Sequence, residues 1–108
     1  MIFTVNENNW ILQFVRPNSK ELRRSDGVYT LGVTDNTTKT VTIADNLSER
    51  MTDKVLCHEL THVYSFENGC QMDMRTEEIV SDFLSLYGRD IVYMADDLMK
   101  IFPKKVAY

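Results

Sequence analysis

The sequence predicts an α+β fold in which a small antiparallel twisted sheet of three or four strands packs on two helices. In residues 1–45, short runs rich in β-branched and aromatic residues alternate with turn residues, which is typical of strands and hairpins. After residue 46, apolar residues recur every three or four positions, which is the period of a helix. The chain has 108 residues, 44% of them hydrophobic, so we expect a single domain with one modest core.

Four segments of the N-terminal half are expected to form strands. Residues 2–5 (IFTV) and 10–15 (WILQFV) flank the turn residues NENN and form one hairpin. Residues 28–34 (VYTLGVT) and 39–44 (KTVTIA) flank DNTT and form a second. The polar stretch between the hairpins is expected to be a loop with room for one helical turn. Trp10, the single tryptophan, is expected in the core.

The first predicted helix runs from about residue 48 to residue 67. Ser48 is a good N-cap, because its hydroxyl can accept a hydrogen bond from an unpaired backbone N–H of the first turn. Asn68 and Gly69 follow the last helical residues and provide the stop, since both tolerate the left-handed conformation common at helix ends.

The second predicted helix begins at a cap provided by Asp73 or Thr76. Its apolar positions keep helical spacing as far as Phe102, and Pro103 ends the helix there. Gly88 lies inside this run, where it can kink the helix or split it in two.

Composition argues against several classes of function. The chain carries 12 Lys and Arg against 16 Asp and Glu, and a net charge of −4 argues against a nucleic-acid partner, which would require a basic surface. No window of about 18 apolar residues occurs, so we expect no membrane span. The N-terminus lacks the basic and apolar regions of a signal peptide, which favours a cytoplasmic protein with Cys57 and Cys70 as reduced thiols.

The segment HELTH, from His58 to His62, contains both histidines of the chain. Residues four apart lie one turn apart on the same helix face, so the two imidazoles can bind one metal ion. Glu59 lies one step round the helix, where it can take a proton from a zinc-activated water rather than bind the metal. H-E-x-x-H on a helix is the form that metallopeptidases use.

The following helix offers a third ligand in the segment TEEIVSD. A catalytic zinc uses three protein ligands and keeps one position for water. Glu78 is favoured because its i+4 neighbour, Asp82, can accept the free N–H of a ligating histidine and fix its tautomer. Glu77 is the competing ligand, but Ser81 stands at its i+4 position.

A metal-free interpretation fits each of these patterns taken separately. A five-residue motif with three fixed positions occurs by chance in many helices, and acidic residues near a helix N-terminus stabilise the helix dipole. Three features together favour a zinc site. The motif lies on a capped helix, apolar residues flank it, and an acidic pair follows on the next helix.

HELTH followed by EEIVSD resembles the gluzincin pattern, in which H-E-x-x-H is followed by E-x-x-x-D on the next helix. Within that group the chain is similar to the small ImmA/IrrE-type metallopeptidases of phages and mobile elements. The hairpin LGVTDNTTKTVTIADNLSE leads into the motif helix as in those proteins, so the similarity covers roughly residues 28 to 92. It implies a zincin-like fold in which KTVTIA is the edge strand that binds an extended peptide.

The resemblance also implies the roles of the site residues. His58, His62 and Glu78 would bind zinc, Glu59 would be the general base, and Asp82 would accept a hydrogen bond from a ligating histidine. The substrate would be a protein or peptide. The best-known relatives act on helix-turn-helix repressors, so a transcriptional repressor is one candidate.

Two functions stay open from the sequence alone. One is a zinc metallopeptidase, and the other is a non-catalytic zinc-binding regulator of phage or mobile-element origin that keeps the same scaffold. Tyr64, Tyr87 and Arg89 are candidates to stabilise the oxyanion of a transition state, but none is assigned. For Arg89, an ion pair with an acidic neighbour on its own helix is the favoured interpretation. The sequence does not indicate an oligomeric state.

Overall fold

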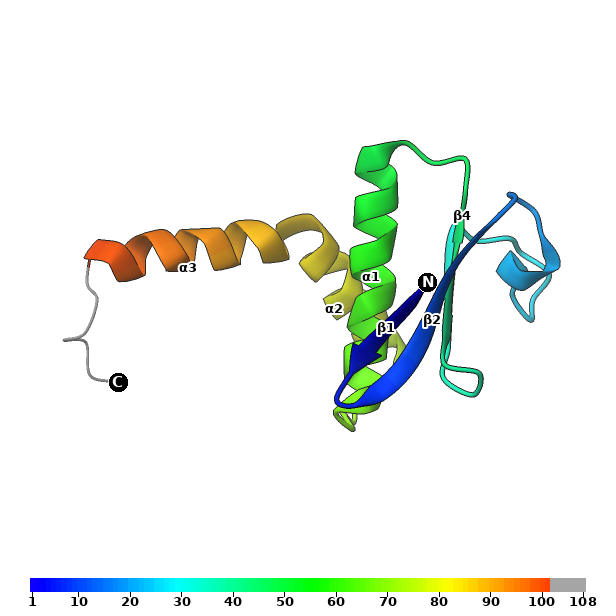
Figure 1. The fold of residues 1–108 in the computed structure, drawn as a ribbon, viewed down its shortest axis with the longest axis horizontal. Coiled ribbons are helices and arrows are strands. Elements are labelled where there is room, and N and C mark those ends of the chain that lie inside the picture. The colour runs from blue at the N-terminus through cyan, green and yellow to red at the C-terminus, as the bar shows by residue number, and fades with distance from the viewer. Residues whose placement is uncertain (102–108) are drawn as a thin grey trace.

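The computed structural model describes residues 1–101 and has an α+β fold in which α1 packs on one face of a four-stranded sheet (Figure 1). The elements follow in the order β1 (Ile2–Val5), β2 (Asn8–Val15), the 3₁₀ turn η1 (Lys20–Leu22), β3 (Gly32–Asp35), β4 (Thr40–Ala44), α1 (Glu49–Glu67), α2 (Met74–Phe83), the π-helical turn η2 (Leu84–Gly88) and α3 (Arg89–Ile101). Phe102 and Pro103, the expected end of the last helix, lie outside the described residues. Within residues 1–101, every helix is too short or too polar to span a membrane.

The sheet has the strand order β1-β2-β4-β3 and is mixed rather than antiparallel. The two predicted hairpins, β1–β2 and β3–β4, are antiparallel. β2 and β4 run parallel, however, with Leu12 opposite Val41 and Phe14 opposite Ile43, so the antiparallel prediction is wrong at this central pair. A parallel pair requires a connection of about a dozen residues or more, and the segment between β2 and β4 provides it because it includes the loop and β3.

β4 is a central strand, so the expectation that KTVTIA forms the sheet edge is wrong. Every residue of β4 except the first is buried, and η1, which carries the buried Leu22, packs against the strand. The edge on this side is β3, whose sequence GVTD is short and ends on a charge, as is common at sheet edges. β3 covers only part of the predicted strand 28–34, because the chain before it is a loop in which Tyr29 forms an isolated bridge with Arg23.

The core lies between the sheet and α1. Trp10, Val41 and Ile43 from the sheet and Val63 from α1 are fully buried there, which confirms the predicted core position of Trp10. Burying one such side chain stabilises a fold by about 1.5–3 kcal/mol. Because these contacts hold α1 against the sheet, they also determine the direction in which the histidines of α1 point.

Both long helices begin at capping residues that the sequence suggested. The Ser48 side chain accepts a 3.1 Å hydrogen bond from a backbone N–H of the first turn of α1. Asp73, rather than Thr76, caps α2, and its carboxylate accepts a 2.7 Å hydrogen bond from the backbone N–H of Thr76. α1 ends at Glu67, and Gly69 beyond it has a left-handed backbone with φ of 62°.

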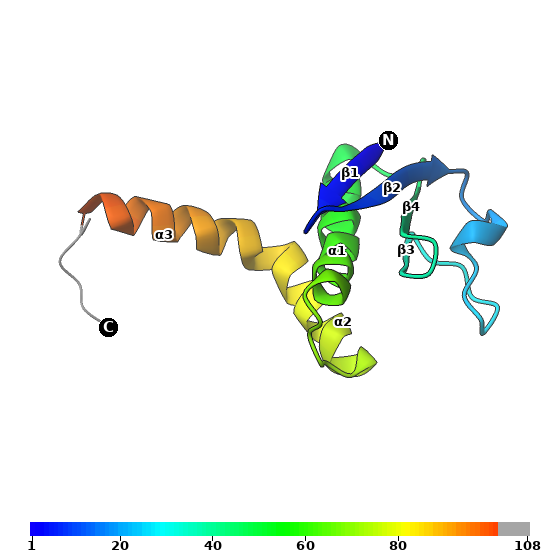
Figure 2. The same ribbon diagram turned by 60° about the horizontal axis from the view of Figure 1, so that its bottom comes forward.

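α2 and α3 form one helical run that the π-helical turn η2 interrupts. This turn ends at Gly88, where the sequence suggested a kink or a split. A Cβ at Gly88 would lie 3.2 Å from Leu84 Cδ2, so the absence of a side chain eases the packing inside this turn. After it, α3 extends away from the sheet and from α1 (Figures 1 and 2). The expectation that the sheet packs on two helices is therefore wrong for the C-terminal helix, since the strands pack on α1 and α2 packs on α1 rather than on the sheet.

Candidate metal centre

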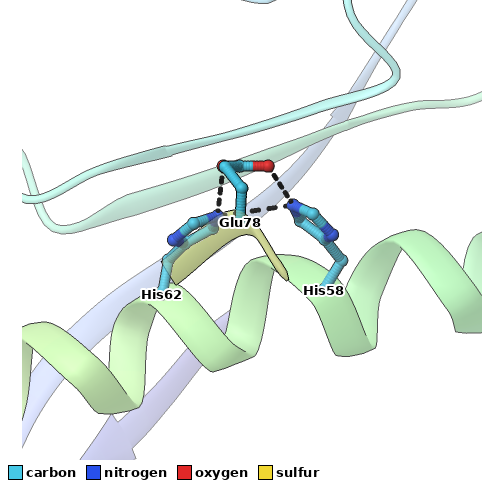
Figure 3. Close-up of side chains that lie close together, drawn as sticks. All are labelled: His58, His62 and Glu78. Atoms are coloured by element: carbon cyan, nitrogen blue, oxygen red, sulfur yellow. Dashed lines mark hydrogen bonds and ion pairs between the residues drawn. The ribbon is translucent and has the colours of Figure 1, made fainter. Parts of the chain in front are cut away.

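α1 and α2 bring His58, His62 and Glu78 together (Figure 3). The two Nε2 atoms of the histidines are 3.3 Å apart. Glu78 Oε2 lies 3.2 Å from His58 Nε2, and Glu78 Oε1 lies 2.9 Å from His62 Nε2. The three residues expected to be ligands therefore direct their donor atoms toward one point.

Each imidazole is oriented by a carboxylate at its other ring nitrogen. Asp82 Oδ1 lies 2.9 Å from His58 Nδ1, and Glu77 Oε1 lies 2.7 Å from His62 Nδ1. An ionised carboxylate only accepts hydrogen bonds, so each Nδ1 carries a proton and donates it. In a neutral imidazole the other nitrogen, Nε2, then presents a lone pair to the cluster.

The three converging groups all present electron pairs to the same small volume. Two imidazole lone pairs and a carboxylate within 2.9–3.3 Å of one another repel, unless a cation lies among them. Protonating both rings would instead place two positive charges 3.3 Å apart. The cluster is therefore compatible with a metal ion, which would satisfy all three groups together.

Glu59 lies beside this cluster without joining it. Its Oε2 is 4.0 Å from His58 Nε2, and its Oε1 accepts a 2.8 Å hydrogen bond from Thr34 Oγ1 on the edge strand β3. Burial raises the pKa of the Glu59 carboxyl, while the hydrogen bond from Thr34 acts in the opposite direction. Thr34 thus holds the side chain at Oε1, while Oε2 faces the histidines.

Residue 32 allows β3 to approach Glu59 closely, because it is glycine. A Cβ at Gly32 would lie 2.7 Å from Val55 Cγ1 and 3.1 Å from Glu59 Cγ, distances that side chains do not tolerate without moving. A larger residue here would separate β3 from α1 and weaken the hydrogen bond from Thr34 to Glu59. Gly32 therefore contributes to the placement of the carboxylate.

Two hollows meet at the cluster. The larger, of about 610 Å³, lies between β3, α1 and the start of α2, and the smaller, of about 210 Å³, lies towards the first turns of α1. Both are lined by Thr30, Gly32, His58 and Glu59. The side chains of the cluster are therefore accessible from two directions along β3.

The candidates for oxyanion stabilisation lie elsewhere. Arg89 binds both oxygens of Asp53 on α1, at 2.7 and 3.0 Å, so the expected ion pair within its own helix is wrong. Arg89 and Tyr64 line a separate groove of about 570 Å³ between α1 and the start of α3. Tyr87 packs against Phe83, with ring centres 5.2 Å apart. None of the three candidates lines either hollow at the cluster.

The sequence interpretation missed the roles of two residues beside the cluster. The sequence presents Glu77 only as a competing ligand, whereas in the structure it is buried and orients His62. A signal was present, because two ligating histidines need two partners for their free N–H groups and Asp82 can serve only one. The contact of Thr34 with Glu59 had no local signal, since it depends on which strand forms the sheet edge.

Comparison with protein-family models, with curated proteins and with solved structures found no match for this chain. What the protein does is therefore inferred from the arrangement of its own side chains. The roles of His58, His62, Glu78, Glu59 and Asp82 stay predictions, although His58, His62 and Glu78 meet at one point and the other two lie next to them.

Proposed function

We propose that this protein is a zinc-dependent metallopeptidase that hydrolyses a peptide bond in a protein or peptide substrate. The proposal depends on one observation, the convergence of His58, His62 and Glu78 beside a buried glutamate, Glu59, that is not itself a member of the donor set. Two imidazoles and one carboxylate, with an adjacent general base, are the groups that such a reaction requires.

The donor set fits zinc in number, type and spacing. Zinc binds imidazole nitrogen at about 2.0–2.1 Å and carboxylate oxygen at about 2.0–2.2 Å, and a tetrahedral arrangement places neighbouring donors about 3.3–3.5 Å apart. The separations of 2.9, 3.2 and 3.3 Å in the cluster are close to this spacing. Magnesium and calcium prefer sites built from oxygen atoms alone, so a set with two nitrogens favours zinc.

In this proposal Asp82 and Glu77 fix the orientation and the tautomer of the two histidines that bind the metal. Each carboxylate accepts the Nδ1 proton of one ring, which holds the ring in place and leaves its Nε2 lone pair free. The negative charge of each partner also makes the ring a better electron donor to a metal.

Zinc, when bound, supplies the Lewis acidity that activates a water and polarises the peptide carbonyl. Glu59 accepts the proton of the attacking water and then delivers it to the leaving amine. Its Oε1 is held by Thr34, so Oε2 is the atom that carries the proton. A buried carboxylate suits this role, because it holds a transferred proton more readily than a fully solvated one.

An extended peptide is the substrate that the surroundings of the cluster suit best. β3 is an edge strand, so its outer backbone groups can pair with an added strand. The two hollows lie on either side of His58 and Glu59, and each can accept residues on one side of the scissile bond. This support comes from β3, not from the strand Thr40–Ala44 that the resemblance implied.

The test measures metal content and cleavage on the same samples. Protein purified without chelators should contain about one zinc per chain by atomic emission, and should cleave members of a mixed peptide library followed by mass spectrometry. Glu59→Gln should keep the zinc and lose on the order of 10²–10⁴-fold in cleavage rate. Glu67→Gln is the matched control, a glutamate of the same helix outside the cluster, and should keep both properties.

The possible results separate the alternatives. Cleavage that persists at the wild-type rate in Glu59→Gln would show that the proposed base is wrong. Protein without bound metal after purification and zinc titration would contradict the metal site itself. Zinc binding without cleavage of any library peptide would favour the second function, a non-catalytic zinc-binding regulator.

A further inference from the structure

The residues between η1 and β3 form a loop that folds back on itself. The backbone N–H of Thr30 donates a 2.9 Å hydrogen bond to the carbonyl of Leu22, and the N–H of Arg24 donates a 2.8 Å hydrogen bond to the carbonyl of Val28. Leu22 is fully buried, and η1, to which it belongs, packs against β4. The loop is therefore anchored to the sheet at its base, and backbone hydrogen bonds hold it in shape.

This loop brings two positive charges to the larger hollow at the metal centre. Arg23 and Arg24 line that hollow together with Glu59 and Glu78. Both glutamates are engaged with the metal centre, because Glu78 contacts the two histidines (Figure 3) and Glu59 lies between Thr34 and the nearer ring. Within residues 1–101, neither glutamate has an arginine within 4.0 Å. The positive charges of the loop are therefore not neutralised by the carboxylates of the site.

The two arginines are available to a ligand. Among the described residues, Arg23 has no carboxylate within 4.0 Å, and Arg24 Nη2 lies 3.7 Å from Asp26 Oδ2. The side chains of that ion pair are 60% and 52% exposed, so the pair is weak and easily exchanged for another. A guanidinium group donates two parallel hydrogen bonds to one carboxylate, which makes arginine the residue best suited to recognise that group.

The smaller hollow has the opposite character. It is lined by three apolar residues, Leu31, Met51 and Val55. Its one lysine, Lys54, shares the lining with two carboxylates, those of Glu59 and Asp82. An acidic group is therefore disfavoured in the smaller hollow and favoured in the larger one.

The backbone of β3 alone gives a peptide few hydrogen bonds. The N–H of Ala44 donates to the carbonyl of Leu31, so the alternation of an antiparallel pair directs the backbone groups of Gly32 and Thr34 to the open edge. The N–H and the carbonyl of Gly32 are both hydrogen-bonded to the Thr30 hydroxyl. Only Thr34 then offers both of its groups to an added strand. Recognition of a peptide must therefore depend largely on its side chains.

We propose that Arg23 and Arg24 form a carboxylate-binding subsite, so that the protein selects peptides with an acidic group in the larger hollow and an uncharged residue in the smaller one. The inference deepens the proposed function and rests on it in that the ligand is a peptide. An aspartate or glutamate side chain and a C-terminal carboxylate present the same group to the two arginines, and the experiment distinguishes them.

Binding is measured by fluorescence anisotropy on zinc-loaded Glu59→Gln, which the proposed mechanism makes unable to cleave. The probes are labelled alanine–serine peptides with one aspartate or one asparagine at each position in turn, and with a free or an amidated C-terminus. The best aspartate peptide should bind at least about 10-fold more tightly than its asparagine counterpart at low salt. Added salt should reduce this preference, because the arginines are exposed. Tighter binding that follows the free C-terminus instead would identify the C-terminal carboxylate as the recognised group.

Variants in the same background assign the preference to the arginines. Arg23→Gln with Arg24→Gln should bind the aspartate and asparagine peptides equally and should keep the melting temperature, since both side chains are exposed. Lys20→Gln is the matched control, a basic residue of η1 that lines neither hollow, and it should keep the preference. Arg23→Glu with Arg24→Glu should favour a lysine peptide over the aspartate peptide, a gain that a misfolded protein would not show.

The outcomes separate this inference from the proposed function. Absence of peptide binding, equal binding of all probes, or an aspartate preference that persists in the double glutamine variant would overturn the subsite. Cleavage of library peptides by the wild type without enrichment of acidic residues or free C-termini near the scissile bond would overturn it too, and would leave the peptidase standing. An arginine-dependent aspartate preference without any cleavage by the wild type would support the subsite and contradict the peptidase.

Discussion

Two glutamates of α1, Glu59 and Glu67, occupy opposite environments on one helix. Glu67 accepts hydrogen bonds from Trp10 Nε1 at 3.1 Å, from Lys39 Nζ at 3.0 Å and from the Asn8 side chain. The hydrogen bonds from Asn8 and Lys39 lower the pKa of Glu67. Glu59 has a single hydroxyl donor, and burial raises its pKa.

The number of hydrogen-bond donors distinguishes the two carboxylates. Glu67 uses its donors to stabilise the fold, whereas Glu59 keeps one oxygen facing the candidate metal centre. The Glu67 side chain is 3% exposed, and its donors connect the end of α1 to β2 and to the β3–β4 turn. Lys39 also lies 5.1 Å from the centre of the Trp10 ring, which adds a cation–π contact. Around Glu59, in contrast, electron pairs from three neighbouring side chains converge without enough donors. A metal ion would complete the second region, and the first has no need of one.

The largest expected difference between the two regions is in metal binding. His62→Ala should weaken zinc binding on the order of 10²-fold or more, because it removes one of three ligands. Glu77→Gln should weaken it about 10–100-fold, because it removes the partner that orients His62. Glu67→Gln should bind zinc like the wild type. Competition with a chromophoric chelator measures all three, and a wild-type affinity in His62→Ala would place the metal elsewhere.

The second expected difference is in the stability of the metal-free protein. Glu67→Gln should lower the melting temperature by about 5 °C near neutral pH, because three donors lose a charged acceptor. Glu59→Gln should leave the melting temperature unchanged or raise it, since it removes a buried charge that has one donor. Thermal unfolding followed by circular dichroism measures both variants. An equal decrease in both would mean that Glu59 has a structural role like that of Glu67.

The smallest expected effect is a pH dependence of the stability that Glu67 contributes. Because its pKa is lower in the folded chain than in the unfolded chain, it stabilises the fold above the ordinary glutamate pKa of about 4.3. That stability is lost as the pH falls through the folded-state pKa. The melting temperatures of metal-free wild type and Glu67→Gln should therefore differ at pH 7, begin to converge as the pH falls below about 4.3, and meet only below the folded-state pKa of Glu67. A constant difference down to the lowest pH would show that the Glu67 charge does not contribute.

The helices could be predicted from the sequence because the signals that determine them are local. Ser48 and Asp73 accept hydrogen bonds from N–H groups only three residues ahead, and helical periodicity is visible in any short window. The same locality explains why His58 and His62 were expected on one face of a helix. The meeting of Glu78 with them requires α2 to pack beside α1, and the sequence suggested it through the i, i+4 pair of Glu78 and Asp82 and through the resemblance.

The strand order could not be predicted, because it depends on pairing between distant segments. Each hairpin is a local structure, but the contact between β2 and β4 joins residues 11–15 to residues 40–44. The burial of β4 on both faces and the short, charged sequence of β3 agree with this order. The contacts of Gly32 and Thr34 with Glu59 depend on the same long-range strand order, because that order makes β3 the edge strand next to α1. The sequence therefore could not predict that β3 lines the candidate site.

The π-helical turn Leu84–Gly88 lets α2 and α3 belong to one helical run and still face different directions. In an α-helix each residue turns the chain by about 100°, so a locally widened turn changes the azimuth of everything after it. Before the turn, Glu78 and Asp82 face the histidines of α1. After the turn, α3 points into solvent (Figure 2). Inserting or deleting one residue in this turn would rotate α3 about its axis by about 100°. The two histidines lie on α1 and would keep their positions. The direction of α3 is therefore set separately from the direction in which Glu78 and Asp82 face α1.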